Sequence, residues 1–418
     1  MKKDTLREIE DEVLSEGQEW IRRRLEQRLQ EEAETLATCP ESGLLLKKKR
    51  QVSFTLMTVA GVVTVRVPYG YSTHAHRWLC PAREHWGLAP HQRLSPEFER
   101  RMTFTAAQTG SFEKAALLAE QWGSRISDDA IHALVQRVGA RAVETPPPPP
   151  LKAFAEPDFS LVIMMDGWMV RQRGPQWGAP PESLNPVRVG WHEVKSAVIY
   201  RLEHRAENQS GRGLLLEKKV VACAPQTQPL EFGAAVQAEA LRCGLARAQE
   251  VLIVADGAAW IWGIIQDRFA TATKTLDFYH CSQHLWELAH HLHPGDPEAA
   301  RQWIEPLLQS LRHDPQHRVV ETLEELLGPS PESPSEKNPP DPALATKVEY
   351  FRTHRDHLDY AALATRGAPI GSGSMESQCS QFQDRLKRRG QFWSPAGLRH
   401  ILALDVAVKN RAYTHLWN

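Results

Sequence analysis

The sequence has no apolar run that approaches the ~20 residues a helix needs to cross a membrane. Its 418 residues include six cysteines, and no two of these form a CxxC pair. This spacing argues against a disulfide framework and against a well-formed zinc ribbon. The N-terminus mixes acidic and basic residues and does not have the pattern of a signal peptide. We therefore expect a cytoplasmic protein.

An excess of either charge is also missing, because 50 Lys and Arg stand against 51 Asp and Glu, for a net charge of −1. Nucleic-acid-binding domains are often basic overall, so this balance argues mildly against that class. The charges are unevenly distributed, however: five glutamates lie within 321–336, and cations gather at 385–389 and 399–400. A local basic patch can bind phosphates on a chain that is neutral as a whole. The length predicts two or three domains with a sizeable core.

One stretch organises the rest of the chain: Val251–Ala255 is an unbroken apolar run that ends at Asp256 and Gly257. A short apolar run bounded by a turn signal predicts a strand that is buried on both faces. The following residues, 258–269, have helical character, so Asp256 falls where a strand ends and a helix begins. Open α/β sheets bind ligands at that edge. The simpler alternative is that Asp256 only caps the helix.

Two further acids have comparable settings. Leu161–Met165 is another apolar run, and it is followed by Asp166, ninety positions before Asp256 (256 − 166 = 90). Glu376 lies one turn inside a predicted helix, just after a glycine-rich turn. Three carboxylates at one place suit Mg²⁺, which prefers oxygen ligands. Two such ions roughly 3.5–4 Å apart can activate the attacking oxygen and stabilise the leaving oxygen in phosphoryl transfer.

These motifs resemble those of DDE transposases of bacterial insertion sequences, of the ISKra type with Mutator-like relatives. The order of the matching segments is the same, and so is the interval of 120 positions between the second and third acids (376 − 256 = 120). The resemblance covers roughly residues 40–415. The segments that carry it are Met165–Trp168, Asp256–Trp260, Asp277–His280 and Gly371–Ser377.

The resemblance implies an α/β fold, with an RNase-H-like mixed sheet and an all-helical insertion. It implies that Asp166, Asp256 and Glu376 form a catalytic triad that holds two Mg²⁺ ions per active site, for which Mn²⁺ can substitute. It also implies that Asp277 and His280 lie beside these acids, where they contact DNA or orient the site. Helix capping by Asp277 and a buried His280 are the simpler alternative.

The remaining patterns predict the domain organisation. A long charged helix near the N-terminus either packs against a partner or folds back on its own domain. The helical pair in 95–145 suits a helix-turn-helix, although two aspartates at the start of its second helix would repel phosphate. A proline run is a stiff spacer, and residues 328–342 form a flexible loop. The predicted parts are the N-terminal helix (1–38), a β-hairpin (39–94), the helix-turn-helix-like region (95–145), the spacer (146–150), the catalytic core (151–280 and 366–418) and the helical insertion (281–365).

The hairpin region carries an arrangement that suggests zinc. Cys39, His74, His76 and Cys80 flank the predicted strands and could form a tetrahedral set. In the family that the sequence resembles, this region often holds a small zinc ribbon with paired cysteines. Each expected pair has lost one member here, so we expect a hairpin without zinc.

A basic run follows Glu376 at a helical distance. Eleven residues turn about 1100°, or close to three rotations, so Lys387 is predicted on nearly the same helix face as Glu376 and roughly 16 Å further along. With Arg388 and Arg389 beside it, Lys387 could hold DNA phosphates that lead into the metal site. A solvated basic face is the ordinary alternative.

The sequence therefore predicts a DNA transposase that cleaves and joins DNA at the ends of an insertion sequence. Its partners would be the terminal inverted repeats and the target DNA, bound by a homo-oligomer in the bacterial cytoplasm, at the nucleoid. Two alternatives remain open: an RNase-H-like nuclease that hydrolyses DNA without joining it, and a domesticated DNA-binding protein that has kept the fold. An intact triad counts against the second.

Overall fold

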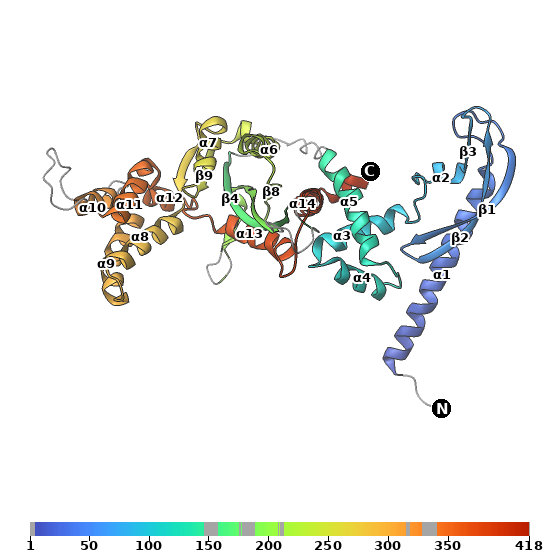
Figure 1. Cartoon of the computed structure of the whole chain (residues 1–418), viewed down its shortest axis with the longest axis horizontal. Coiled ribbons are helices and arrows are strands. Elements are labelled where there is room, and N and C mark those ends of the chain that lie inside the picture. Colours follow the sequence, from blue (N-terminus) through green and yellow to red (C-terminus); the bar gives the residue numbers. More distant parts are fainter. Residues whose placement is uncertain are drawn as a thin grey trace. The chain divides into compact units, whose positions relative to one another are not determined.

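The computed structural model divides the chain into two compact units, each described by itself below (Figure 1). One unit consists of Met1–Thr145 together with Tyr413–Asn418, and the other of Pro146–Ala412. The last residues of the chain thus group with the N-terminal unit, whereas the sequence assigned them to the catalytic core. The predicted proline spacer and residues 328–340 of the predicted loop lie outside the described residues. The residues described are 5–145, 158–174, 177, 189–207, 209, 213–314, 318–327 and 341–417.

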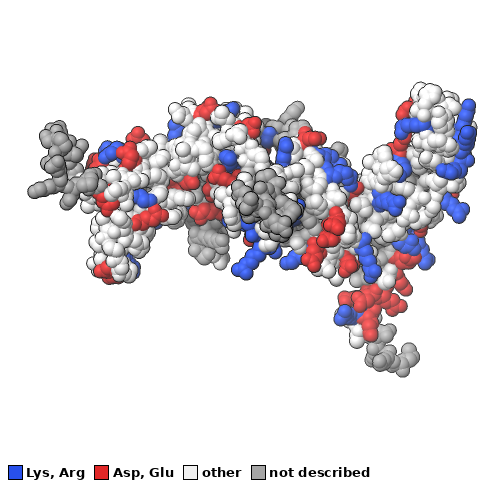
Figure 2. Space-filling view, in the orientation of Figure 1, with Lys and Arg blue, Asp and Glu red and all other residues white. Residues whose placement is uncertain are grey.

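The N-terminal unit begins with helix α1 (Leu6–Thr35), whose first turn is closed by a capping box between Thr5 and Glu8. Strands β1 (Lys47–Thr58) and β2 (Gly61–Ser72) form the predicted hairpin, and β3 (Arg77–Leu79) adds a short third strand. Alternate hairpin residues enter the unit's core against Ala33 of α1; they are Phe54, Leu56, Val63, Val65 and Val67. Figure 2 shows a row of Lys and Arg side chains along the border of this unit over β1, which begins Lys-Lys-Lys-Arg.

Helix α1 folds back on its own unit, which is one of the two placements that the sequence left open. Glu26 accepts a hydrogen bond from the backbone N–H of Thr64 at 2.8 Å. Gln30 accepts one from the N–H of Arg66 at 2.8 Å and donates one to its carbonyl at 3.1 Å. These side chains bind the backbone hydrogen-bonding groups along the part of the β2 edge that β3 does not reach. That part of the edge is therefore closed to pairing with another chain.

A helical region follows in the same unit, as predicted. Ser111 and Ser127 cap α4 and α5, and both accept a hydrogen bond from the N–H three residues on. Tyr413, in the 3₁₀ helix η4 (Tyr413–Trp417), donates its hydroxyl to the carbonyl of Arg100 at 2.7 Å, which fastens the end of the chain to α3. The helices are α2 (Pro81–His85), α3 (Pro96–Gln108), α4 (Phe112–Gln121) and α5 (Asp128–Glu144).

The second unit is built on a mixed five-stranded sheet with the order β10-β9-β4-β5-β8. Three strands form an antiparallel meander, β4 (Ser160–Arg173), β5 (Val189–Arg201) and β8 (Lys219–Cys223). On the other side of β4, β9 (Glu250–Ala255) and β10 (Thr273–Leu276) add in parallel. Residues 214–223 do not form one continuous strand, because β7 (Gly213–Leu215) pairs with β6 (Arg205–Glu207) in a separate ribbon.

Helices cover both faces of this sheet. On one face, α6 (Pro229–Arg242) and α7 (Ala259–Arg268) pack against Leu161, Ile163 and Met165 of β4. On the other face lies α13 (Gly373–Leu386), whose Phe382 stacks on Trp168 of β4 with ring centroids 6.0 Å apart. Because side chains alternate along a strand, the residues of β4 at odd positions face α6 and α7, and those at even positions face α13. Helix α14 (Pro395–Lys409) contacts β8.

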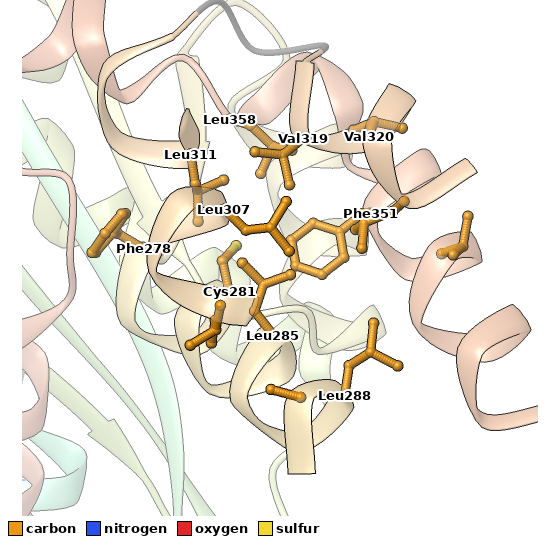
Figure 3. Close-up of a cluster of buried hydrophobic side chains, with 14 of the residues drawn as sticks. Phe278, Cys281, Leu285, Leu288, Leu307, Leu311, Val319, Val320, Phe351 and Leu358 are labelled. Atoms are coloured by element: carbon orange, nitrogen blue, oxygen red, sulfur yellow. The ribbon is translucent and has the colours of Figure 1, made fainter. Parts of the chain in front are cut away.

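The predicted helical insertion is present between β10 and α13, and it has its own core (Figure 3). Leu285 and Leu288 of α8 meet Leu307 of α9 and Phe351 of α11. Tyr360 ties this core to the sheet, because its hydroxyl donates to the carbonyl of Leu276 at 2.9 Å. Within the described residues, no helix is long and apolar enough to cross a membrane. The helices are α8 (Phe278–Leu292), α9 (Pro297–His313), α10 (Arg318–Leu327), α11 (Pro342–Thr353) and α12 (Tyr360–Thr365).

Candidate active site

The strand register brings two of the predicted acids together. In the parallel pairing of β4 with β9, Met165 is the partner of Ala255. Asp166 and Asp256 are the next residues along these two segments, and they therefore stand level with each other. Met165 and Ala255 both belong to the core under α6 and α7. Alternation thus turns both aspartates toward the opposite face of the sheet, the face that α13 covers.

The sequence predicted that Asp166 follows the end of a strand, but this is wrong. Strand β4 continues past Asp166 to Arg173 in antiparallel pairing with β5. Asp166 is paired with Ser196 of β5 in the middle of that ladder. Its other neighbour, β9, stops at Ala255, so the sheet has a step beside Asp166. The Asp-Gly pair signals a turn in sequence, but the residues after it alternate between buried and exposed positions and extend the strand instead.

Asp256 follows β9 directly, and both of the roles that the sequence left open fit its position. Its Oδ1 accepts a hydrogen bond from the N–H of Ala258 at 3.0 Å, just before α7 begins. The indole N–H of Trp262 donates to the Asp256 carbonyl at 2.7 Å. These two bonds hold the residue at the edge of the sheet. The next residue must be small, since a Cβ on Gly257 would lie 2.5 Å from the ring of Tyr350.

The environment of Asp166 disfavours its negative charge. Burial, and after it the nearby charge of Asp256, raise the pKa of Asp166 to about 6. Two hydrogen bonds oppose the shift: the N–H of Gly167 donates to Oδ1 at 2.6 Å, and the thiol of Cys379 approaches Oδ2 at 3.6 Å. A cation placed between the two carboxylates would relieve the repulsion and favour the ionised form.

Glu376 lies in the first turn of α13, as predicted, and its side chain is exposed. Cys379 follows three residues later on the same helix, which is about 4.5 Å along its axis, and contacts Asp166. The carboxylate of Glu376 thus stands within about one helical turn of the residue that touches Asp166. Sequence inspection missed Cys379, although its spacing of three from Glu376 places both residues on neighbouring parts of one helix face.

The start of α13 is fastened to the sheet by Asp277. Its Oδ2 accepts a hydrogen bond from the N–H of Ser372, whose carbonyl in turn accepts the N–H of Glu376 at 3.0 Å. The backbone N–H of Asp277 donates to the carbonyl of Ala255, next to Asp256, at 2.8 Å. Its Oδ1 caps α8 through the N–H of Tyr279 at 2.7 Å. Asp277 thus links three elements that carry or adjoin the acids.

The side chain of Asp277 is fully buried, with 0% of its surface exposed, so its contacts fit the orienting role rather than contact with DNA. Burial by itself would raise the pKa of Asp277, but the bonds from His280 and Ser372 outweigh it and hold the pKa below its usual value. Nδ1 of His280 lies 3.6 Å from Oδ1 of Asp277. Asp277 first, and then the charges of Asp256 and Asp166, raise the pKa of His280. The acidic cluster therefore favours the protonated, positively charged form of the half-buried His280.

The structure does not support the helical alignment of Lys387 with Glu376. Helix α13 ends at Leu386, and Lys387 is its cap residue with φ −122° and ψ 48°. The chain then turns at Gly390, which has a φ of 75°, and Trp393 joins the edge of β4 through hydrogen bonds with Arg171 and Arg173. Lys387, Arg388 and Arg389 are all exposed. They form a basic patch at the end of α13, but helical phase no longer decides where they point.

The donor set fits an ion that is completed by its substrate. Among the residues that the structure describes, no group of three or more His, Cys, Asp or Glu side chains stands close enough to hold a metal ion. Asp166 and Asp256 do interact, and the exposed Glu376 lies three residues before Cys379, which contacts Asp166. Mg²⁺ in phosphoryl-transfer sites is commonly bound through one or two carboxylates together with waters and substrate phosphates. The arrangement therefore suits Mg²⁺ bound with a phosphate better than a closed protein cage.

The four residues that suggested zinc in the N-terminal unit have separate environments. The thiol of Cys39 accepts a hydrogen bond from the hydroxyl of Ser72 at 3.2 Å in a small cluster with Leu46 and Leu79. Cys80 belongs to the larger core of the hairpin. His74 and His76 are exposed. The expectation that this region binds no zinc stays a prediction.

Part of the chain is similar to a family of known proteins. Residues 244–415 match the family described as "Uncharacterised protein family (UPF0236)", a stretch that contains Asp256, Asp277 and Glu376 but not Asp166. A relative from Streptococcus gallolyticus, "UPF0236 protein in vanSb 3'region", is 24% identical over 333 residues. The match covers 78% of this chain and 66% of that protein, so the chain spans just under two thirds of the relative's length.

One solved structure with similarity to this chain is the "Drosophila P element transposase strand transfer complex". The sequences are 10% identical, the match covers 76% of this chain and 78% of the other, and the TM-score is 0.25. At that TM-score the likeness carries no argument about the fold or the function of this chain.

Proposed function

We propose that this chain is a DNA transposase of the DDE type, which cleaves DNA at the ends of an insertion sequence and joins them to target DNA. The observation that carries the proposal is the register of β4 and β9. It sets Asp166 level with Asp256 on the face of the sheet under α13, the helix whose first turn carries Glu376. The assignment to the ISKra type rests on the sequence motifs.

The RNase-H-like fold is part of the same proposal. Its support is the topology of the second unit, where a three-stranded meander is followed by two strands in parallel with the first. Parallel strands need crossover connections, and α6 and α7 supply them. The helical insertion then separates the second acid from the third, which accounts for the interval of 120 positions (376 − 256 = 120).

Each acid has a distinct task in the proposed reaction. Asp166 and Asp256 would hold the metal ions, and Glu376 would complete the second site. Two bound Mg²⁺ ions, or Mn²⁺ in their place, would supply the activation of the attacking oxygen and the stabilisation of the leaving oxygen. Water is the first attacking group and a DNA 3′-hydroxyl the second, each in line with the bond that breaks.

The surrounding residues would position these acids. The N–H of Ala258 holds one oxygen of Asp256, and the N–H of Gly167 holds one oxygen of Asp166. Asp277 fixes the end of β9 relative to the start of α13. The raised pKa of His280 favours its positively charged form beside the acids, and in that form it would also attract a phosphate. The proposed partners are the terminal repeats and target DNA, bound by a homo-oligomer at the nucleoid.

Strand transfer into plasmid DNA tests the proposal against its closest rival. A labelled DNA end is incubated with the full-length protein, plasmid and Mg²⁺, and the products are separated on denaturing gels. A transposase yields label joined to the plasmid, whereas a nuclease with the same acids yields only hydrolysed fragments. A folded protein that binds the ends but produces neither product would identify a DNA-binding protein without catalysis and contradict the proposal.

A further inference from the structure

Beyond Asp166, the β4–β5 hairpin carries an exposed tryptophan between two cations. Trp191 of β5 is paired with Arg171 of β4, and 54% of its surface is exposed. The guanidinium carbon of Arg171 lies 5.6 Å from the centre of the Trp191 ring. The ammonium nitrogen of Lys387, from the end of α13, lies 5.4 Å from the same ring. Three separate elements thus converge on one aromatic side chain.

The contacts that hold this arrangement are specific. Arg171 donates to the carbonyl of Arg388 at 2.5 Å, and its guanidinium carbon also lies 4.9 Å from the ring of Phe392. The N–H of Trp393 donates to the carbonyl of Arg171 at 3.1 Å. The segment that follows α13 is therefore fastened to β4, and Lys387 is held beside Trp191 rather than left on a loose chain.

The ordinary role of an exposed Arg–Trp pair across a hairpin is a small gain in stability. Three features favour a ligand here. A large aromatic ring keeps more than half of its surface in water, next to Met169, which is 41% exposed. The exposed cations Lys387, Arg388 and Arg389 follow one another at its border. Lys and Arg side chains also project from the surface of this unit near α13 in Figure 2. An aromatic face bordered by cations suits a nucleobase with its phosphates.

We propose that Trp191, with Arg171 and Lys387, is a stacking platform for an unpaired base of the DNA strand that is cleaved. A base inside a duplex is covered on both faces, so a tryptophan can stack only on a base that has left the duplex or ends it. Such stacking accepts any base, because every base has an aromatic face. The platform is therefore selective for single-stranded structure and not for sequence.

The link between the platform and the cleaved strand rests on the proposed function, in which that strand is bound at Asp166 and Asp256. Arg171 is five residues beyond Asp166 on the same strand (171 − 166 = 5), or roughly 17 Å at about 3.3 Å per residue, and the odd separation puts the two side chains on opposite faces of β4. DNA advances about 3.4 Å per nucleotide along one strand. A strand with its reacting phosphate at Asp166 and Asp256 would have to reach the other face of β4 to place a base at Trp191, so the two sites are at least about five nucleotides apart along that strand.

Equilibrium binding by the full-length protein in EDTA tests the platform without any cleavage. The probes are a fluorescein-labelled 15-nucleotide oligo(dT) and a duplex of the same length, measured by anisotropy. Loss of one stacked base predicts that Trp191→Ala weakens oligo(dT) binding by about 5- to 150-fold. Duplex affinity should change by no more than about two-fold, because a duplex contributes only its phosphates to this surface.

Two variants serve as controls. Trp191→Phe keeps an aromatic face and should restore most of the affinity for oligo(dT). Trp20→Ala removes a tryptophan of α1 that is 68% exposed, and it should leave both affinities unchanged. The platform is overturned if Trp191→Ala binds oligo(dT) as the parent does, if it loses affinity for both probes equally, or if the parent does not bind oligo(dT).

The outcomes also separate the platform from the proposed function. A parent that binds oligo(dT) through Trp191 but never cleaves DNA in Mg²⁺ would retain the platform and contradict the transposase. A parent that cleaves and joins DNA, while Trp191→Ala binds oligo(dT) normally, would retain the transposase and contradict the platform.

Discussion

The carboxylate of Asp277 accepts a hydrogen bond from the backbone N–H of Ser372, 95 residues further along the chain. This contact docks the glycine-rich turn before α13 onto the end of β10, and the backbone of Asp277 is bound at the same time to Ala255 of β9. The segments that carry Asp256 and Glu376, which lie far apart in sequence, are thus both hydrogen-bonded to a single buried residue. Asp277 sets their separation before any ligand arrives.

This relationship predicts a large cost for Asp277→Ala. The change removes a buried acceptor of the N–H groups of Tyr279, His280 and Ser372, and bonds to charged groups contribute about 1.5–3 kcal/mol each. We expect a loss of about 3–5 kcal/mol in the free energy of unfolding, measured with urea at pH 7. Asp296→Ala is the control: Asp296 is an exposed cap of α9 whose carboxylate accepts a hydrogen bond from the N–H of Ala299, and its loss should cost about 1 kcal/mol.

The pH dependence of the Asp277 contribution has a definite sign. Its pKa is lower in the folded protein than in the unfolded chain, so its stabilisation is complete above about pH 4 and is lost as the pH falls through the folded value. The difference between the parent and Asp277→Ala should therefore shrink below pH 4. Equal costs for Asp277→Ala and Asp296→Ala at pH 7 would show that Asp277 is only a helix cap.

Asp166→Asn should stabilise the metal-free protein at neutral pH. The folded pKa of about 6 lies above the unfolded value near 4, so folding favours the protonated form. The contribution of Asp166 to stability is then most favourable below about pH 4, falls as the pH rises from about 4 to 6, and is lower by about 3 kcal/mol above that range. An amide has no charge to bury, so the melting temperature of Asp166→Asn in EDTA should exceed that of the parent at pH 7.5 but not at pH 4.

Addition of Mg²⁺ should raise the parent's melting temperature more than the variant's. A variant no more stable than the parent at pH 7.5 would contradict this account of Asp166.

Much of this arrangement follows from the sequence, and the exceptions have physical causes. The strands β4 and β9 are visible as apolar runs because they are buried on both faces. The continuation of β4 past Asp166 is not, since the Asp-Gly pair signals a turn and only the partner strand β5 extends the ladder. Nor is the end of α13 at Leu386, where the carbonyl of Leu386 accepts the indole N–H of Trp393 at 2.8 Å and the backbone of Trp393 pairs with the distant strand β4.

The contacts that complete the site are the least accessible to sequence reasoning. Cys379 and Asp166 are 213 positions apart, and no local pattern links a thiol to a carboxylate at that separation. The stacking of Trp191 between Arg171 and Lys387 depends likewise on tertiary packing. By contrast, the three acids were recognisable together because each has its own local signature, either a strand end or a glycine-rich turn before a helix.

The N-terminal unit should contain no stoichiometric zinc. Cys39 and Cys80 lie in separate hydrophobic clusters, and the partners that a zinc ribbon would need beside them are missing from the sequence. Elemental analysis of protein purified without chelator checks this. About one zinc per chain, lost in a Cys39→Ser and Cys80→Ser double variant, would prove the expectation wrong.

Lys387→Ala should weaken binding to duplex ends of every sequence by a similar factor. Loss of one phosphate contact also lowers the slope of log K against log salt by about 0.9. Arg399→Ala, which removes an exposed cation of α14, should have a smaller effect. Binding of an end-containing duplex at several salt concentrations compares both variants with the parent. An unchanged slope for Lys387→Ala would mean that this charge is only solvated.

The most direct test of the proposed catalytic site is Mg²⁺-dependent cleavage of the element's ends by Asp256→Asn beside the parent. An amide keeps the shape of the side chain and its bond to the N–H of Ala258, but it removes the charge that a divalent ion requires. The account predicts that cleavage is abolished, while the melting temperature and the affinity for DNA in EDTA stay close to those of the parent. Cleavage by Asp256→Asn within a few-fold of the parent would show that Asp256 does not hold the catalytic metal.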